Sequence, residues 1–425
     1  MYEPLKGFRD FYPEEMEARR EVIETVESVV RRYGFREIGT PALEPTALYV
    51  DKSGPEIVEE LYSFTDRGGR EVALTPELTP TVARMVAARH QAMTKPIKWY
   101  STRPFWRYEE PQQARFREFY QTNIDIFGSV EPTADAEILA VCGDLLTELG
   151  LERGDFEFRV SHRDILGELV RWVDPTADVA AAIRAIDRTD GAGWEATVDE
   201  LVDAGLEAGD ADTLAETLAE ASDDLRVLRR VDRPAVDEAV DELAAVLEAA
   251  EEFGARRHCR LSLSTARGLD YYTGVVFECF DTQGEIGRSI FGGGRYDDLI
   301  ASVGGPDMPA VGVAPGLAPL SLMLQRAGVW PSGTPEVEYF VLHVGGTRAV
   351  AADIARTLRE RGHRVAFDVA GRNFGGQLEY ADAVGARTTV IVGERDLADD
   401  VVTVKDMATG DQERRPVAEF LDGAD

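Results

Sequence analysis

The sequence predicts an α+β fold in which an antiparallel sheet is flanked by helices, with a helical insertion and a separate C-terminal α/β domain. Two strand-like runs within residues 99–127 flank a polar loop, which is typical of an antiparallel hairpin. Residues 162–253 are rich in Ala, Asp and Glu at helical spacing, and strand and helix patterns alternate from Val337 onward. At 425 residues the chain can hold two or three domains with sizeable cores.

The net charge of the chain is strongly negative. It has 78 acidic and 46 basic residues, a net charge of −32, and lysine occurs at only a few positions. Proteins that bind phosphate usually have basic surfaces, so one interpretation is that the protein binds no nucleic acid. The other is that it works at high salt, because at about 1 M the Debye length is roughly 3 Å and distant carboxylates barely repel RNA. We favour the second interpretation, since acidic, lysine-poor surfaces resemble those of halophile proteins.

Composition also bears on location and on metal content. No apolar run approaches the roughly 18 residues of a membrane span, and the N-terminus lacks a charged-then-apolar signal pattern. We therefore expect a cytoplasmic protein with no membrane partner. Cys142, Cys259 and Cys279 are widely spaced and odd in number, so neither a disulfide framework nor a structural metal site is expected.

The N-terminal region predicts a helix followed by strands. An apolar stripe at Ile23, Val26 and Val30 predicts a helix over residues 14–33, with Gly34 just beyond its C-terminus. Residues 35–38 and 71–74 predict short strands. The second strand leads into a helix through Leu74-Thr75-Pro76-Glu77-Leu78-Thr79, where a threonine can cap the helix and the glutamate is a first-turn acid.

Residues 99–127 predict a hairpin with many charged side chains. Its predicted strands, residues 99–109 and 115–127, contain Phe105-Trp106-Arg107-Tyr108-Glu109 and Arg115-Phe116-Arg117-Glu118-Phe119-Tyr120-Gln121. In an ordinary hairpin these charges would simply alternate outward with a period of two.

The remaining elements follow from similar signals. In the insertion, Asp232 is predicted to cap a helix that has Pro234 in its first turn and ends at Gly254. Residues 308–320 predict a strand and then a helix, and residues 330–335 a linker. A βαβαβ pattern then predicts a small, mostly parallel sheet covered by helices, over residues 337–344, 348–361, 364–369, 376–384 and 388–392.

Two glycine-flanked stretches carry the most distinctive chemistry. Residues 267–274 read Arg-Gly-Leu-Asp-Tyr-Tyr-Thr-Gly, and residues 289–298 place three glycines before Arg-Tyr-Asp. Glycine lets a backbone pass close to a ligand. The first stretch alone is equally compatible with a strand end that holds an ion pair and core tyrosines. Together the two stretches resemble the histidine-specific motifs of the histidyl-tRNA synthetases, a family of class II aminoacyl-tRNA synthetases.

Other segments resemble the same family in the same order. Residues 6–10 resemble its N-terminal Arg-Gly-Thr-Arg-Asp element, residues 14–41 its motif 1, which forms the dimer interface, and residues 99–127 its motif 2. The resemblance implies a class II antiparallel catalytic domain formed by residues 1–162 and 255–330. It further implies a helical insertion at residues 163–254 and an anticodon-binding domain at residues 336–425.

The resemblance also implies roles for individual residues. Arg107 and Arg267 would hold the α-phosphate of ATP from opposite sides and are the expected catalytic residues. Glu109 would orient the nucleotide, Phe119 would stack on adenine, and Arg115 would contact ATP as well. The expected histidine-binding residues are Thr75, Pro76, Glu77, Gln121, Asp125, Tyr271 and Tyr272, with the glutamate bound to the α-ammonium group.

The sequence departs from the family pattern at several positions. Asp125 is one methylene shorter than the glutamate of bacterial members. Glu110 stands where many relatives have a basic residue near the tRNA 5′ end. Pro319 occupies the position of the motif 3 arginine that covers adenine and meets the γ-phosphate, and Arg115 is the nearest candidate to replace that charge.

The implied activity is ATP-dependent attachment of L-histidine to tRNA-His through histidyl adenylate, in a cytoplasmic homodimer of haloarchaeal type. ATP would bring Mg²⁺, and no protein-bound structural metal is expected. A rival interpretation is a non-catalytic histidine sensor on the same fold, such as the regulatory subunit of ATP phosphoribosyltransferase. Pro319 favours the sensor, whereas Arg107, Arg267 and the C-terminal domain favour the synthetase.

Overall fold

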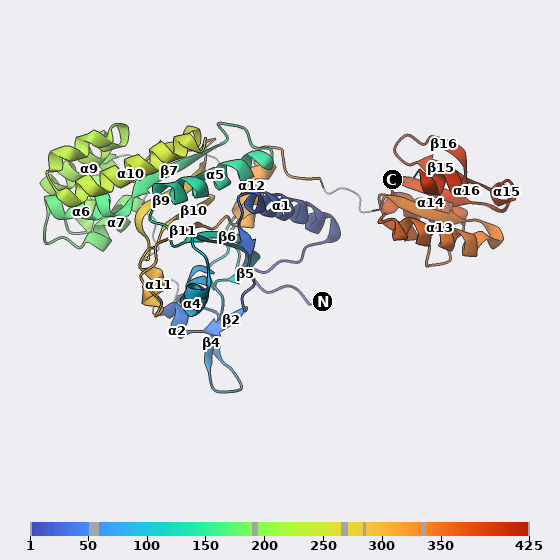
Figure 1. Ribbon diagram of the computed structural model, residues 1–425, viewed down its shortest axis with the longest axis horizontal. Helices are drawn as coiled ribbons and strands as arrows, with labels where there is room; N and C mark the ends of the chain where they lie inside the picture. Colours follow the sequence, from blue (N-terminus) through green and yellow to red (C-terminus); the bar gives the residue numbers. More distant parts are fainter. Residues whose placement is uncertain are drawn as a thin grey trace. The chain divides into compact units, whose positions relative to one another are not determined.

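The structure is a computed structural model that describes residues 2–50, 59–188, 194–264, 271–283, 286–332 and 337–423. The chain divides into two compact units, Met1–Pro331 and Ser332–Asp425. Figure 1 shows both, coloured along the sequence.

A large sheet forms the centre of the first unit. Among the described residues it has eight strands in the order β1-β5-β6-β11-β10-β9-β7-β8. The inner pairs are antiparallel, and only the outermost pairs, β1 with β5 and β7 with β8, are parallel. The strands are β1 (Arg36–Glu37), β5 (Ile97–Trp106), β6 (Glu118–Phe127), β7 (Phe156–His162), β8 (Cys259–Leu261), β9 (Thr273–Asp281), β10 (Phe291–Arg295) and β11 (Ala310–Val313).

Helices cover the two faces of this sheet differently. On one face α5 (Pro132–Glu148) contacts both α1 (Pro13–Arg32) and α10 (Pro234–Glu252), and α12 (Leu317–Arg326) contacts β6. The main apolar core lies under these helices. On the other face α4 (Thr79–Arg89) packs against α11 (Leu299–Ser302) over a smaller core. Figure 1 shows α1, α5 and α10 on one side of the sheet and α4 and α11 on the other.

Two further groups of elements complete the first unit. A small antiparallel sheet contains β2 (Leu43–Pro45), β4 (Glu71–Leu74) and β3 (Ser63–Thr65), with the short helix α2 (Ala47–Val50) beside it. Between β7 and α10 the chain is helical, with α6 (Arg163–Val173), α7 (Val179–Arg188), α8 (Trp194–Asp203), α9 (Ala208–Asp223) and a 3₁₀ segment at Leu225–Val231. None of the helices within the described ranges is both long and apolar enough to cross a membrane.

The second unit has its own mixed sheet. Within residues 337–423 five strands lie in the order β13-β12-β14-β15-β16, parallel among the first three and antiparallel beyond them. The elements are β12 (Tyr339–His343), α13 (Arg348–Glu360), β13 (Val365–Phe367), α14 (Phe374–Ala383), β14 (Thr388–Val392), α15 (Glu394–Ala398), β15 (Val401–Asp406), β16 (Gln412–Pro416) and α16 (Val417–Asp422). The predicted βαβαβ order is confirmed, and α15, β15, β16 and α16 extend it.

Most predicted elements of the first unit are confirmed. The N-terminal helix is α1, and Gly34 follows it with φ +80°, a conformation in which glycine carries no strain. The strand at residues 71–74 is β4. The hairpin is confirmed, but β5 ends at Trp106 and β6 begins only at Glu118, so Arg107, Glu109 and Arg115 lie in the connecting loop.

One predicted helix cap is wrong. Arg233 rather than Asp232 is the N-cap residue of α10. The residue before a proline is restricted to extended conformations, and Arg233, which precedes Pro234, has φ −124° and ψ 118°. Asp232 instead has φ +52°, a left-handed conformation that closes the preceding 3₁₀ segment.

Candidate active site

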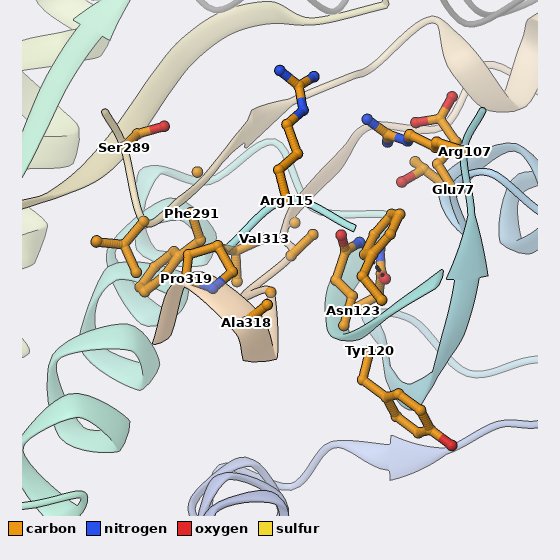
Figure 2. A pocket seen from close by; sticks show the side chains of 18 of the residues that line it. Glu77, Arg107, Arg115, Tyr120, Asn123, Ser289, Phe291, Val313, Ala318 and Pro319 are labelled. Atoms are coloured by element: carbon orange, nitrogen blue, oxygen red, sulfur yellow. Dashed lines mark hydrogen bonds between the residues drawn. The ribbon is translucent and has the colours of Figure 1, made fainter. Parts of the chain in front are cut away.

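A cavity of about 240 Å³ lies against the face of the large sheet that carries α4. Its lining comes from the start of α4, the β5–β6 hairpin, residues 271–272, residues 288–296, and the segment from β11 to α12. Figure 2 shows Glu77 and Arg107 at one end, and Phe291, Ala318 and Pro319 at the other. The sheet thus brings together segments that are far apart in the sequence.

Strand β6 contributes a row of polar side chains because successive residues of a strand point to opposite faces. Ile124 and Ile126 belong to the apolar core under α5. Gln121, Asn123 and Asp125 therefore point to the other face, where they line the cavity. The side-chain amide of Gln121 donates to Oδ1 of Asn123 at 2.9 Å, so the protein itself orients this part of the row.

Two pairs of a phenol and a carboxylate lie along the cavity. The Tyr271 hydroxyl donates to Oε2 of Glu77 at 3.2 Å, and the Tyr296 hydroxyl donates to Oδ1 of Asp125. Both carboxylates are buried, with exposed fractions of 4% for Glu77 and 3% for Asp125. Buried acceptors of this kind suit a small ligand that carries N–H donors, because an ill-matched ligand would leave them unpaired.

The pKa values of these groups reflect their burial. Loss of hydration raises the pKa of Asp125 to about 7, although the hydrogen bond from Tyr296 acts in the opposite direction. Burial, and then the negative charge of Glu77, raise the pKa of Tyr271. Asp125 therefore exchanges a proton near neutral pH, while Tyr271 remains a hydrogen-bond donor.

Strand β11 lies so close to the side chains of Asp125 and Tyr296 that only glycine fits at position 312. Gly312 pairs with Asp125 in the register of β11 and β6. A Cβ atom on Gly312 would lie 2.3 Å from Oδ1 of Asp125 and 2.7 Å from the Tyr296 hydroxyl. A Cβ on Gly293 would lie 2.3 Å from the Gly312 carbonyl oxygen. Gly312 thus leaves room for the Asp125 and Tyr296 side chains, whereas Gly293 allows close packing toward Phe277 in the core on the other face of the sheet.

A guanidinium and an aromatic ring lie side by side just beyond the end of β5. Nε of Arg107 donates to the Pro76 carbonyl at 3.0 Å. The Arg107 guanidinium lies 5.5 Å from the centre of the Phe119 ring. Because Pro76 fixes Nε, the two terminal nitrogens of Arg107 are held in one orientation, a suitable geometry for a phosphate group.

The hairpin loop carries an ion pair between Arg115 and Glu109. The Glu109 side chain is 8% exposed and that of Arg115 is 44% exposed. Burial raises the pKa of Glu109, and the charge of Arg115 opposes this shift. Figure 2 shows the Arg115 side chain extending away from Asn123 and Pro319.

Helix α12 begins at the far end of the cavity. Gly316 is its N-cap residue, and Pro319 lies in the first turn, where the missing N–H removes no helical hydrogen bond. Ala318 and Pro319 both line the cavity (Figure 2). Neither carries a charge, so the first turn of α12 supplies no cation.

The structure gathers most of the predicted site residues in this cavity. Those that line it are Glu77, Arg107, Glu109, Arg115, Phe119, Gln121, Asp125, Tyr271 and Tyr272. Thr75 does not line it, because its side chain is fully buried and its hydroxyl donates to the carbonyls of Pro41 and Ala42. Pro76 meets the site through the carbonyl that Arg107 binds. Arg267 lies outside the described residues.

Some lining residues were not predicted as site residues. Asn123 could have been found from the two-residue period that it shares with Gln121 and Asp125. Tyr296 lies in the glycine-rich stretch, but its pairing with Asp125, 171 residues away, left no local signal. Arg288 also lines the cavity, and no pattern in the sequence distinguishes it.

Comparison with known proteins identifies the family. Residues 7–320 match the family model described as histidyl-tRNA synthetase, and residues 338–424 match the one described as anticodon binding domain. The histidine–tRNA ligase of Haloarcula marismortui is 62% identical over 99% of this chain and 97% of its own length, and so is that of Natronomonas pharaonis.

A solved structure shows the same fold. The crystal structure of histidyl-tRNA synthetase from Nostoc sp. PCC 7120 superposes with a TM-score of 0.85, at 24% identity, over 100% of this chain and 99% of that one. With a family model that covers most of the chain and relatives at this level of identity, the chain belongs to the histidyl-tRNA synthetase family.

Proposed function

We propose that this protein attaches L-histidine to tRNA-His in two steps that consume ATP, and that the cavity described above carries out the first. The observation that carries this proposal is the presence of two chemically distinct parts in one cavity. One part holds the buried carboxylates of Glu77 and Asp125, and the other holds Arg107 beside Phe119. An amino acid and a nucleotide can therefore bind next to each other.

Histidine would bind at the carboxylate part. Glu77 would accept hydrogen bonds from the α-ammonium group, a charge-assisted contact strengthened by burial. Asp125, whose pKa is about 7, would bind an imidazole nitrogen, with Gln121 beside it on the same strand. Tyr271 and Tyr272 would close the pocket. An amino acid without the imidazole would leave the buried polar groups unpaired, which is the physical basis of discrimination.

ATP would bind at the guanidinium part. Arg107 would hold the α-phosphate through its fixed fork of donors, and Phe119 would stack on adenine. Glu109 would accept a hydrogen bond from the nucleotide and so orient it. Thr75 and Pro76 would act indirectly, since the first anchors the segment before α4 and the second positions Arg107.

The two chemical steps require mainly positioning and charge neutralisation. In the first, a carboxylate oxygen of histidine bonds to the α-phosphorus, the bond to the bridging oxygen breaks, and pyrophosphate leaves. Arg107 would stabilise the charge on the α-phosphate, and Arg267, which lies outside the described residues, is proposed to act from the opposite side. In the second step a ribose hydroxyl at the tRNA 3′ end attacks the histidyl carbonyl, and AMP leaves.

Magnesium would enter with ATP. Mg²⁺ in such sites takes most of its ligands from phosphates and water. Within the described residues there is no group of three or more His, Cys, Asp or Glu side chains able to hold a metal, which is compatible with an ion bound mainly by the triphosphate. Its chemistry there would be to neutralise phosphate charge.

The remaining parts of the chain would bind tRNA and form the dimer. Residues 338–424 would bind the anticodon, and the helical insertion would contact the acceptor arm. We propose a homodimer formed through the α1 and β1 region. Leu43 and Phe64 of the small sheet are exposed apolar side chains, which a partner subunit would cover.

The net charge of −32 leads us to propose that the protein works in a cytoplasm of high salt, where screening lets an acidic protein bind RNA.

The first test of the proposed function is charging of tRNA-His with labelled histidine in molar KCl, with the other amino acids as controls. Charging with histidine alone supports the proposal. Histidine binding without charging would favour the sensor, an alternative not favoured by the full-length similarity to histidine–tRNA ligases.

A further inference from the structure

Arg288 links the hairpin loop to the segment that precedes β10. It lies just before β10, and its Nη2 donates to the carbonyl of Gln113 at 2.6 Å, across 175 residues of sequence. Its side chain is half-buried and lines the cavity together with Arg115. The segment before the three glycines and the loop between β5 and β6 therefore meet at this arginine.

The electrostatic surroundings of Arg288 are unfavourable for a cation. Burial and then the positive charge of Arg115 lower its pKa, while Glu109 acts in the opposite direction. Glu109 is already the ion-pair partner of Arg115. In the part of the chain that the structure describes, no carboxylate forms an ion pair with Arg288, and the guanidinium group donates its hydrogen bond to the neutral carbonyl of Gln113. Two guanidinium groups thus share one carboxylate at this side of the cavity.

This arrangement is unusual in a chain with a net charge of −32, where carboxylates greatly outnumber cations. A half-buried cation without a counterion carries a desolvation cost that an anionic ligand can offset. Among the described residues that line the cavity, those at its α12 end, Ala318 and Pro319, carry no charge. An anion that reaches past Arg107 would therefore find its positive charge at Arg115 and Arg288.

We propose that Arg288, together with Arg115, binds the β- and γ-phosphates of ATP and the pyrophosphate that leaves. This assignment rests on the proposed function. Arg107 would hold the α-phosphate, and the rest of the triphosphate would extend toward the hairpin loop. The Gln113 carbonyl keeps one guanidinium nitrogen of Arg288 occupied and leaves the others available for phosphate oxygens.

The test compares two ligands that differ in the terminal phosphates. One is a non-hydrolysable ATP analogue, and the other is a sulfamoyl analogue of histidyl adenylate, which has the adenosine and histidine parts but no β- or γ-phosphate. Affinities are measured by isothermal titration in molar KCl for the wild type, Arg288→Ala and Arg288→Lys. Arg226→Ala is the control, since that arginine is exposed and paired with Asp224 in the insertion.

Arg288→Ala is expected to weaken binding of the ATP analogue roughly 10- to 100-fold, as for loss of a hydrogen bond between charged groups, with the lysine variant in between. Affinity for the adenylate analogue is expected to change less than about twofold, because that ligand lacks the phosphates. In pyrophosphate exchange the KM for pyrophosphate should rise while the KM for histidine stays constant. Arg226→Ala should match the wild type throughout.

Equal losses for both ligands would overturn the assignment, because Arg288 would then only tether the hairpin loop. Unchanged affinity for the ATP analogue would overturn it as well. If the wild-type protein binds neither ligand, the proposed function itself fails, and that result is distinct from a defect confined to the Arg288 variants.

Discussion

The hydroxyl of Tyr296 donates a hydrogen bond to the carboxylate of Asp125, which joins the first residue after β10 to the polar row of β6. Both side chains are almost fully buried, and Gly312 leaves them the space that they occupy. Recognition of the imidazole side chain is therefore proposed to depend on a carboxyl group whose charge changes near neutral pH.

The first prediction concerns the effect of this carboxyl group on stability. Because its pKa is about 7 in the folded protein and 3.8 in the unfolded chain, the folded state holds the proton more tightly. The contribution of this proton to the free energy of unfolding is fully present below pH 3.8 and is lost as the pH rises through 7. Chemical unfolding in molar KCl should show that the wild type loses about 2–3 kcal/mol more than Asp125→Asn between about pH 5 and pH 8.

Asp125→Asn is a suitable comparison because its amide oxygen can still accept the Tyr296 hydrogen bond. If the free energy of unfolding changed equally with pH in the two proteins, the raised pKa of Asp125 would be contradicted. A steeper profile in the asparagine variant would contradict the sign of the effect.

A methyl group at Gly312 should disrupt histidine binding. The added carbon of Gly312→Ala would lie 2.3 Å from Asp125, so the carboxylate or the strand must move. We expect histidine affinity to fall roughly 10- to 100-fold, in proportion to the cost of overpacking a rigid site. Titration calorimetry measures the affinity, and Gly39→Ala is the control because a Cβ there meets nothing within 4 Å. Similar affinities for both alanine variants would refute the close packing behind Asp125.

The first turn of α12 carries no cation. The positive charge that binds the terminal phosphates of ATP is therefore expected to come from the hairpin loop. Arg115→Ala is expected to weaken ATP binding by roughly 100-fold or more, because the variant loses a phosphate donor and leaves Glu109 unpaired. Pro319→Arg should change ATP affinity only modestly, since the loop already supplies the charge. Titration with a non-hydrolysable ATP analogue gives both values. A large gain for Pro319→Arg would mean that the loop does not compensate.

Removal of the second unit should impair tRNA charging much more than adenylate formation. Every described residue assigned to adenylate formation lies in the unit that ends at Pro331. A chain that ends at this residue should retain histidine-dependent pyrophosphate exchange within about threefold and lose most tRNA charging, because anticodon contacts are absent. Circular dichroism would verify that the shortened chain is folded. Equal loss of both activities in a folded chain would argue against this division.

Periodic patterns in the sequence were sufficient to predict the elements but not the contacts between them. The strand at residues 71–74 and the helix α1 follow from local alternation and a terminal glycine. The predicted cap at Asp232 is wrong because Pro234 restricts Arg233 to an extended conformation, and this places the helix boundary one residue later. Strand β16 is exposed along its whole length, so it has none of the apolar alternation that identifies a strand, and in β15 only Val402 is fully buried.

The candidate site was predictable where its residues lie within motifs. Arg107, Glu109 and Asp125 could be named from the resemblance of the hairpin to the synthetase family, and β6 carries its polar row on one face because its side chains alternate with a period of two. The contacts of Asp125 with Tyr296 and of Gln113 with Arg288 depend on how distant segments meet in the sheet. No local pattern encodes such contacts, and they became visible only in the folded chain.

Histidine-dependent exchange of labelled pyrophosphate into ATP, in molar KCl, tests the central claim most directly, because it reports formation of the adenylate without requiring tRNA. The account predicts exchange with histidine and with no other amino acid, and a reduction of about 10²–10³ in Arg107→Ala, in which the α-phosphate loses its donor. Wild-type protein that binds histidine but exchanges no pyrophosphate would contradict the assignment of this cavity to histidine activation.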